Sequence, residues 1–321
     1  MDSFPAATPV ALSGRGVTLA THQAGSGPAV VFTHGFPDLA FGWRNQVGVT
    51  AAAGFHAIAP DQRGYGGSTA PADVDAYGLT QLTGDLVGLL DALEIEKACF
   101  VGHDWGGFVA WAMAVLHPSR VLGVAGLCTP YMPFPSVETH LAVVGGDVIR
   151  QYVAWFQEPG TAEAEMDAAV RPILTRILRT AVPLEEAVRY ALSDGALNMN
   201  PFHQAEAWPV LGEALGEPGD LDHYCEVFER TGFRGGINWY RNIDRNAAEH
   251  PLVGTQKLSI PCLMLTAELD LGLRPEFTDG MHALCPDLEL HHIKKVGHWM
   301  QQEVPAQVNA HLLPWLARVA R

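Results

Sequence analysis

The stretch Gly102-His103-Asp104-Trp105-Gly106 has the spacing of a nucleophile held on a sharp turn between a strand and a helix. Hydrolases of esters usually carry serine at the centre of this pattern, whereas this chain carries a carboxylate. A carboxylate that attacks carbon forms an alkyl ester, so we expect the target to be an electrophilic sp3 carbon, as in an epoxide or alkyl halide. Because an isolated aspartate here is more often a simple helix cap, the other motifs must decide.

Hydrolysis of such an ester needs a base that activates water, and the chain has a candidate histidine after the nucleophile. His298 lies in Val296-Gly297-His298-Trp299, directly after the last expected strand, where an imidazole can activate water. Asp270 follows the preceding strand and can orient the imidazole; Glu268 is the less favoured substitute. The loop at 129–131 carries no carboxylate, which favours Asp270. The order nucleophile, acid, histidine is that of the α/β-hydrolase fold.

A fourth feature is His34-Gly35-Phe36-Pro37, directly after an expected strand at 29–33. In this fold, the loop after that strand and the residue after the nucleophile supply the backbone N–H groups of an oxyanion hole. We therefore expect the amides of Phe36 and Trp105 to form it. The glycine-rich stretch at 61–68 lacks the Lys-Ser/Thr ending of a phosphate loop, so we interpret it as a structural loop beside the site.

The elements around Asp104 are expected to position it. A short apolar run at 98–101 predicts a buried strand, and a longer one at 108–116 predicts a buried helix that ends before Pro118. Glycines in the turn remove the Cβ atoms that would clash where strand and helix approach each other. Asp104 is then expected in a strained conformation at a helix N-terminus, which favours negative charge.

Along the chain, short apolar strands alternate with helical patterns, which is typical of a mostly parallel sheet flanked by helices. After a proline cluster at 130–135 the pattern becomes helical for more than a hundred residues, and strands then resume. We expect an α/β-hydrolase core at 1–133 and 256–321, with an inserted helical lid at 134–255. The strands are expected at 17–22, 29–33, 56–59, 98–101, 121–128, 261–266 and 288–293, with helices at 79–93 and 305–319.

Composition narrows the function classes. The 321 residues are 48% hydrophobic and 17% charged, enough apolar content for a large core. The formal net charge of −15 argues against nucleic acid and anionic membranes as partners, since both require a basic surface. Five scattered cysteines without a C-x-x-C pair indicate neither a disulfide framework nor a zinc site, and His291 and His292 alternate along a strand, so we expect no metal. No secretion signal or membrane span is recognisable, and we expect a cytoplasmic protein.

Taken together, five motifs resemble those of the soluble epoxide hydrolase family, particularly the hydrolase domain of the vertebrate enzymes. The motifs are His34 to Pro37, Gly102 to Gly107, Phe156 to Gly160, Asn238 to Asn242 and Gly297 to Trp299. The likeness extends over nearly the whole chain. Vertebrate members carry a separate N-terminal phosphatase domain, which we do not expect here because the first core strand is expected near Val17.

The resemblance implies a reaction that converts epoxides to vicinal diols, with a role in detoxification. Asp104 would form a covalent hydroxyalkyl ester, and His298, held by Asp270, would then assist the attack of water. Two lid tyrosines would hydrogen-bond the epoxide oxygen; the matching positions are Tyr152 and Tyr240. Phenols with a pKa near 10 suit this task, since they can protonate an alkoxide without being ionised at neutral pH. No cofactor is implied.

Two alternatives stay open from the sequence. Haloalkane dehalogenases share the aspartate nucleophile and the following tryptophan, whose indole can bind halide, so Trp105 does not discriminate between them. The two tyrosines favour an epoxide, because a halide leaving group needs no proton. A non-catalytic small-molecule receptor is the other alternative, which the complete catalytic set disfavours.

The expected partners are an apolar epoxide and water, with no nucleic acid or membrane, and the protein is expected to be a monomer or homodimer. An apolar pocket wall fits this substrate class. The residues expected to bind substrate are Phe36, Pro37, Trp105, Phe156, Trp239, Trp299 and Met300.

Overall fold

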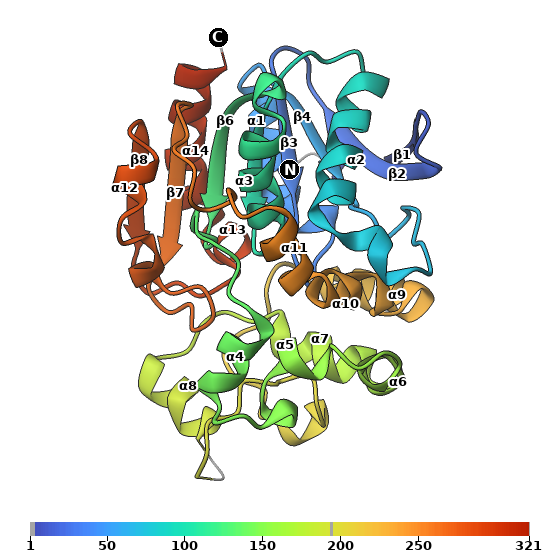
Figure 1. Ribbon diagram of the computed structural model, residues 1–321, viewed down its shortest axis with the longest axis vertical. Helices are drawn as coiled ribbons and strands as arrows, with labels where there is room; N and C mark the ends of the chain where they lie inside the picture. Colours follow the sequence, from blue (N-terminus) through green and yellow to red (C-terminus); the bar gives the residue numbers. More distant parts are fainter. Residues whose placement is uncertain (1–3, 193–194, 321) are drawn as a thin grey trace.

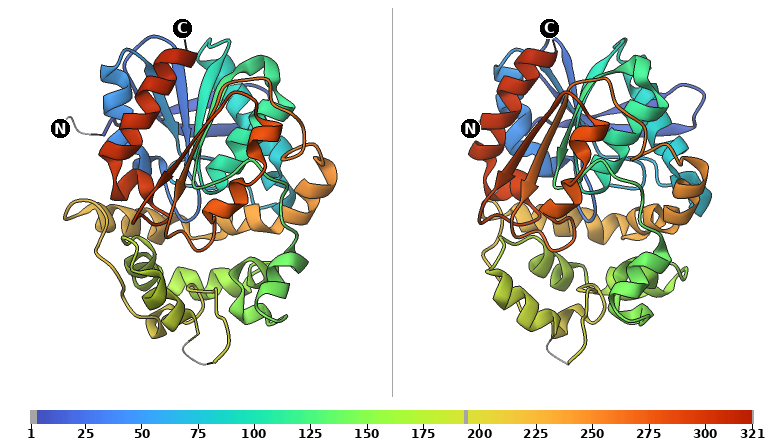
Figure 2. Two further views of the ribbon diagram at one scale, coloured as in Figure 1. Left: turned by 90° about the vertical axis from the view of Figure 1, so that its left-hand side faces the viewer. Right: turned by 60° about the vertical axis from the view of Figure 1, so that its left-hand side comes forward.

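A computed structural model describes residues 4–192 and 195–320. One sheet has the strand order β1-β2-β4-β3-β5-β6-β7-β8 (Figures 1 and 2). Neighbours from β4 to β8 are parallel, whereas β2 runs antiparallel to both β1 and β4. The strands are β1 Ala7–Leu12, β2 Val17–Ala24, β3 Ala29–Thr33, β4 His56–Pro60, β5 Ala98–His103, β6 Val121–Leu127, β7 Cys262–Ala267 and β8 Leu288–Ile293. This mostly parallel sheet confirms the predicted fold class.

The strand β1 corrects the expectation that the sheet begins near Val17. β1 forms an antiparallel edge pair with β2, in which Leu12 lies opposite Val17. Most of its residues are exposed and only Leu12 is buried. Its apolar run, Val10 to Leu12, is only three residues long and follows a proline, which explains why the sequence pattern did not indicate a strand.

Helices cover both faces of the sheet. Because successive strand residues point to opposite faces, Val30 and Phe32 pack into one core cluster while Val31 packs into the other. The first cluster lies against α1 and α14, the second against α2 and α3. The core helices are α1 Arg44–Ala52, α2 Leu79–Ala92, α3 Trp105–Leu116, α12 Met281–Leu284, α13 Met300–Glu303 and α14 Pro305–Val319. The helices expected at 79–93 and 305–319 correspond to α2 and α14.

A run of helices, here called the helical insertion, separates β6 from β7. In Figure 1 it lies beyond the carboxyl ends of the parallel strands, with α9, α10 and α11 next to the core and α4 to α8 further away. Its members are α4 Val137–Val143, α5 Tyr152–Trp155, α6 Thr161–Ala168, α7 Val170–Ile177, α8 Leu184–Ala191, α9 Asp220–Thr231, α10 Arg234–Arg241 and α11 Ile243–Glu249. Short 3-10 helices occur at Ala40–Trp43, Val74–Tyr77, Pro118–Arg120, Val148–Arg150, Ala205–Ala207 and Pro275–Thr278.

Two further observations concern the chain as a whole. Within the described ranges, no helix combines the length and apolar character needed to cross a membrane. All five cysteines are buried free thiols.

Candidate active site

Asp104 occupies the single position between the end of β5 and the start of α3. Its backbone is strained, with φ 51° and ψ −126°. The turn is so tight that a Cβ at Gly106 would collide with the carbonyl group of Thr33, and one at Gly35 with the Asp104 carboxylate itself. The structure therefore contains the strand, strained turn and helix that the sequence predicts.

Backbone amides hold the Asp104 carboxylate. Its Oδ1 accepts a hydrogen bond of 2.8 Å from the N–H of Phe36, and the neighbouring N–H of Trp105 also favours the ionised carboxylate. Burial raises the pKa of Asp104 above its usual value, although the positive charge of His298 and these two amides oppose the shift. The two amides expected to form an oxyanion hole thus lie together at this carboxylate.

His298 follows β8 and bonds to Asp270, which follows β7. The distance from His298 Nδ1 to Asp270 Oδ2 is 2.8 Å, and Oδ1 of Asp270 accepts the N–H groups of Gly272 and Leu273 at 2.9 Å each. Burial opposes ionisation of Asp270, but His298 and these amides outweigh it and lower the pKa of Asp270 to about 2. The exposed Glu268 instead accepts the N–H of Lys295. The structure therefore brings Asp270 to His298, and not Glu268.

The other nitrogen of His298 faces Asp104. Nε2 lies 3.7 Å from Oδ2 of Asp104, and the two side chains remain 27% and 14% exposed, so water can reach the pair. Burial alone would lower the pKa of His298, but the charges of Asp270 and Asp104 raise it to about 9. In this state the imidazole is protonated at neutral pH.

Tyr152 and Tyr240 come from two inserted helices and meet each other. Tyr152 begins α5 and Tyr240 lies in α10; their ring centroids are 5.5 Å apart, with an angle of 78° between the ring planes. Burial raises the pKa of both phenols, and the nearby negative charge of Asp104 raises each further. Both hydroxyls therefore keep their protons beside Asp104.

Aromatic side chains surround these groups. Phe36, Trp105 and Phe156 each contact the ring of Tyr240, with centroids 5.1 to 5.3 Å apart. Trp239 packs against Trp105 and donates its indole N–H to the carbonyl of Arg63, which ties α10 to the core loop at 61–68. This aromatic cluster contains four of the residues expected to bind substrate, and Pro37 directly follows Phe36.

Within the described residues, Trp299 and Met300 have no ring contact with Tyr240. The Trp299 ring packs against His103 and His298, and its indole N–H donates to the carbonyl of Ile177 at 2.6 Å. Met300 is fully buried in the core cluster shared with α1 and α14. Trp299 therefore lies beside the histidine of the site, whereas Met300 belongs to the core on the other face of the sheet.

Known proteins resemble this chain in sequence and in fold. Residues 28–208 match the family described as alpha/beta hydrolase fold. The chain is 39% identical over 310 residues to epoxide hydrolase A of Mycobacterium tuberculosis, with 94% of each chain covered. It is also 39% identical over 306 residues to bifunctional epoxide hydrolase 2 of Sus scrofa, with 95% of this chain and 54% of that protein covered. The crystal structure of epoxide hydrolase A from Mycobacterium thermoresistibile matches with a TM-score of 0.85, 39% identity and 98% of each chain.

The chain belongs to the epoxide hydrolase family. It spans about half the length of the vertebrate relatives it matches.

In this epoxide hydrolase family member, two residues that sequence reasoning missed hold the backbone of His298. The His298 carbonyl accepts hydrogen bonds from Nε2 of His103 at 2.7 Å and from Sγ of Cys128 at 3.2 Å. Burial and the charge of His298 keep the pKa of His103 well below its usual value, so His103 stays neutral. Its position directly before Asp104 was the available signal, whereas nothing in the sequence marked Cys128.

Within residues 4–192 and 195–320, one group of side chains could hold a metal ion, because its ligand atoms lie within 4.8 Å of one another. The group consists of His103, Cys128 and His298. The donor atoms of His103 and Cys128 already bond to the His298 carbonyl. A metal ion would have to displace both hydrogen bonds, so we assign these side chains to hydrogen bonding.

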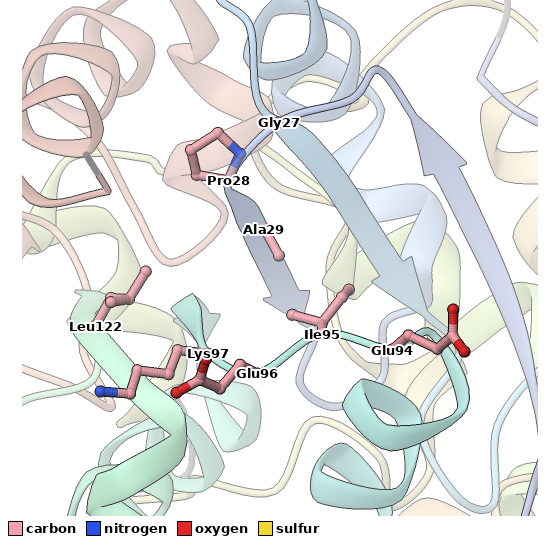
Figure 3. A pocket seen from close by; sticks show the side chains of 8 residues that line it. All are labelled: Gly27, Pro28, Ala29, Glu94, Ile95, Glu96, Lys97 and Leu122. Carbon is pink, nitrogen blue, oxygen red and sulfur yellow. The ribbon is translucent and has the colours of Figure 1, made fainter.

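A separate surface hollow lies at the opposite end of the sheet of this epoxide hydrolase family member. Its lining includes Pro28 before β3, Lys97 before β5 and Leu122 at the start of β6 (Figure 3). These residues mark the amino ends of the strands, whereas Asp104 follows the carboxyl end of β5. Ligands of α/β sheets bind at the carboxyl ends, so this hollow is not the candidate active site.

Proposed function

We propose that the protein hydrolyses apolar epoxides to vicinal diols through a covalent ester on Asp104. The observation that carries this proposal is one carboxylate, Asp104, that lies 3.7 Å from Nε2 of His298 and whose charge also raises the pKa of both Tyr152 and Tyr240. The names of the relatives, all epoxide hydrolases, support the same reaction. We propose that the helical insertion, within residues 134–255, acts as the lid of this site.

The first step opens the epoxide ring. A carboxylate oxygen of Asp104 attacks one ring carbon, the bond from that carbon to the epoxide oxygen breaks, and an alkyl ester forms. The oxygen gains negative charge and takes a proton from the hydroxyl of Tyr152 or Tyr240. Since both phenols have a raised pKa, they are protonated before the reaction and can donate.

The second step needs a neutral His298, and the first step creates one. Alkylation removes the charge of Asp104, which is one of the causes of the raised pKa of His298. His298 can then release its proton to the tyrosinate that the first step left behind. Its Nδ1 remains bonded to Asp270, so the freed Nε2 faces the ester.

Water completes the reaction. His298 takes a proton from a water molecule whose oxygen attacks the ester carbonyl. The bond from the carbonyl carbon to the ester oxygen, which came from Asp104, then breaks, and the leaving alkoxide takes the proton of the new carboxyl group and departs as the diol. Negative charge on the Asp104 carbonyl oxygen is stabilised by the amides of Phe36 and Trp105; one such donor is typically worth about 3 kcal/mol. Asp104 ends ionised and His298 protonated, as both began.

Diol formation tests the proposal directly. Wild type should convert styrene oxide, a stilbene oxide or a fatty-acid epoxide to its diol, whereas Asp104→Ala should not. Asp279→Asn changes an exposed aspartate and serves as the matched control, with unchanged turnover. Diol formation that persists in Asp104→Ala would refute the proposal. Halide release from a brominated alkane without diol formation from any epoxide would instead indicate a haloalkane dehalogenase.

A further inference from the structure

One carboxylate joins the helical insertion to the loop that carries His298. Glu303 is the last residue of α13; its Oε1 accepts the N–H of Gly297 at 3.1 Å, and its Oε2 accepts the N–H of Ala181 at 3.1 Å. Gly297 directly precedes His298, whereas Ala181 belongs to the segment after α7. The carboxylate of Glu303 therefore bridges two backbones that lie 116 positions apart in the chain, as their numbers 181 and 297 give.

The residue on the other side of His298 is tied to the same segment. Trp299 donates its indole N–H to the carbonyl of Ile177, which ends α7. Gly297 lies so close to Ala181 that an added Cβ would come within 2.6 Å of the Ala181 Cβ. Both sequence neighbours of His298 are thus linked to residues 177–181: Gly297 through Glu303, and Trp299 directly.

Core residues bind the carbonyl and the imidazole of His298. His103 and Cys128 bond to the His298 carbonyl, and Asp270 bonds to its imidazole. On the amide side, the core holds Val296 through the N–H of Leu269, whereas the N–H of Gly297, next to His298, is bound by Glu303. A half-buried carboxylate that accepts backbone N–H groups gives strong, charge-assisted hydrogen bonds, so the loss of Glu303 should release the loop on that side.

We propose that Glu303 is a positioning residue through which residues 177–181 of the helical insertion set the position of the His298 imidazole. This inference rests on the proposed function, in which His298 acts as a base only during ester hydrolysis. Alkylation depends on Asp104 and the two tyrosines, none of which bonds to Glu303 in the described structure. Loss of the bridge should therefore slow the second step and spare the first.

Rapid-quench kinetics on the full chain with styrene oxide can separate the two steps. For Glu303→Gln we expect alkylation of Asp104 within about twofold of wild type and ester hydrolysis slowed about tenfold or more, since small misplacements of a reacting group are costly. The ester should then accumulate and appear in the intact-protein mass. Glu303→Ala should show a larger effect, because the amide oxygen of glutamine still accepts one of the two N–H groups.

A matched control and a second variant keep the test decisive. Glu165 also accepts a backbone N–H, that of Gln204, but has no contact with residues 297–299, so Glu165→Gln should leave both steps unchanged. Trp299→Phe removes the bond to Ile177 while it keeps an aromatic ring, and it should slow ester hydrolysis in the same selective way. This variant also provides the test if Glu303→Gln fails to fold.

The possible failures are distinguishable. Equal slowing of both steps would mean that Glu303 only supports the fold, and unchanged hydrolysis would mean that the bridge does not position His298; either result overturns the inference. If wild type itself forms no ester while it produces diol, the proposed function fails and the positioning role fails with it.

Discussion

Nε2 of His298 lies 3.7 Å from Oδ2 of Asp104, while Nδ1 lies 2.8 Å from Oδ2 of Asp270. One imidazole therefore stands between two carboxylates, and their charges raise its pKa to about 9 against the opposing effect of burial. In the proposed mechanism, only the Asp104 charge disappears when the ester forms. The same residue that attacks the substrate thus controls the protonation of the base.

This relationship predicts that the rates of the two steps depend on pH through different groups, Asp104 for alkylation and His298 for ester hydrolysis. Alkylation should be lost as the pH falls through the pKa of Asp104, which burial raises above 3.8, because only the ionised carboxylate attacks. Ester hydrolysis should increase with pH as His298 loses its proton, with a midpoint below 9 because the ester no longer contributes the Asp104 charge. Single-turnover rates measured across the pH range would test both limits. Hydrolysis that slows as the pH rises from 5 to 9 would contradict this account.

His298→Gln should stop the reaction at the ester. Glutamine cannot act as a base near neutral pH, so hydrolysis should fall by about two to four orders of magnitude while alkylation continues. Intact-protein mass spectrometry should then show an increase equal to the mass of the epoxide. The increase should be absent in the double variant Asp104→Ala, His298→Gln, and its presence there would place the ester on another residue.

Tyr152 and Tyr240 should affect alkylation and not ester hydrolysis. Tyr240→Phe and Tyr152→Phe should each slow alkylation, and the double variant by about two to four orders of magnitude, because no proton donor would remain for the epoxide oxygen. Phenylalanine preserves the ring contacts among Tyr152, Tyr240 and Phe156. Burst-phase measurements would separate alkylation from hydrolysis, and an unchanged alkylation rate in the double variant would refute the tyrosine role.

A buried ion pair beneath the site should contribute to stability without taking part in catalysis. Asp85 accepts two hydrogen bonds of 2.6 Å from Arg63 and one of 2.9 Å from Arg15. Asp85→Asn leaves a buried guanidinium without its counter-charge, and it should lower the free energy of unfolding by about 3–5 kcal/mol.

Urea unfolding would measure that loss. Asp91→Asn is the matched control, since Asp91 pairs with Arg120 but is 63% exposed, and its effect should stay below about 1 kcal/mol. Equal losses in the free energy of unfolding would show that the buried ion pair contributes no more to stability than the exposed one.

The sequence could predict much of the candidate site because its main groups follow strands in a fixed order. Asp104 comes directly after β5, while Asp270 and His298 lie in the loops that follow β7 and β8, and parallel strands bring their carboxyl ends to one edge. The pattern of strands along the chain is therefore sufficient to place all three side chains together. The roles of Tyr152 and Tyr240 were predicted from the family resemblance, since helical periodicity alone does not determine which face of a helix lines a site.

The contacts that hold these groups were beyond the sequence. Cys128 donates to the backbone carbonyl of His298 and Glu303 accepts the backbone N–H of Gly297, and a hydrogen bond to a backbone atom leaves no pattern of residue types in the sequence. Met300 was expected in the substrate wall because it is apolar, yet it is buried in the core cluster shared with α1 and α14. Apolar character did not determine the direction of the side chain.

A single turnover in water labelled with heavy oxygen tests the covalent ester most directly. With enzyme in excess over styrene oxide, the first diol formed should contain no heavy oxygen, and the peptide that contains Asp104 should gain the label. Water attacks the ester carbonyl in the proposed mechanism, so its oxygen remains on Asp104. Heavy oxygen in the first diol with an unlabelled Asp104 peptide would contradict the account.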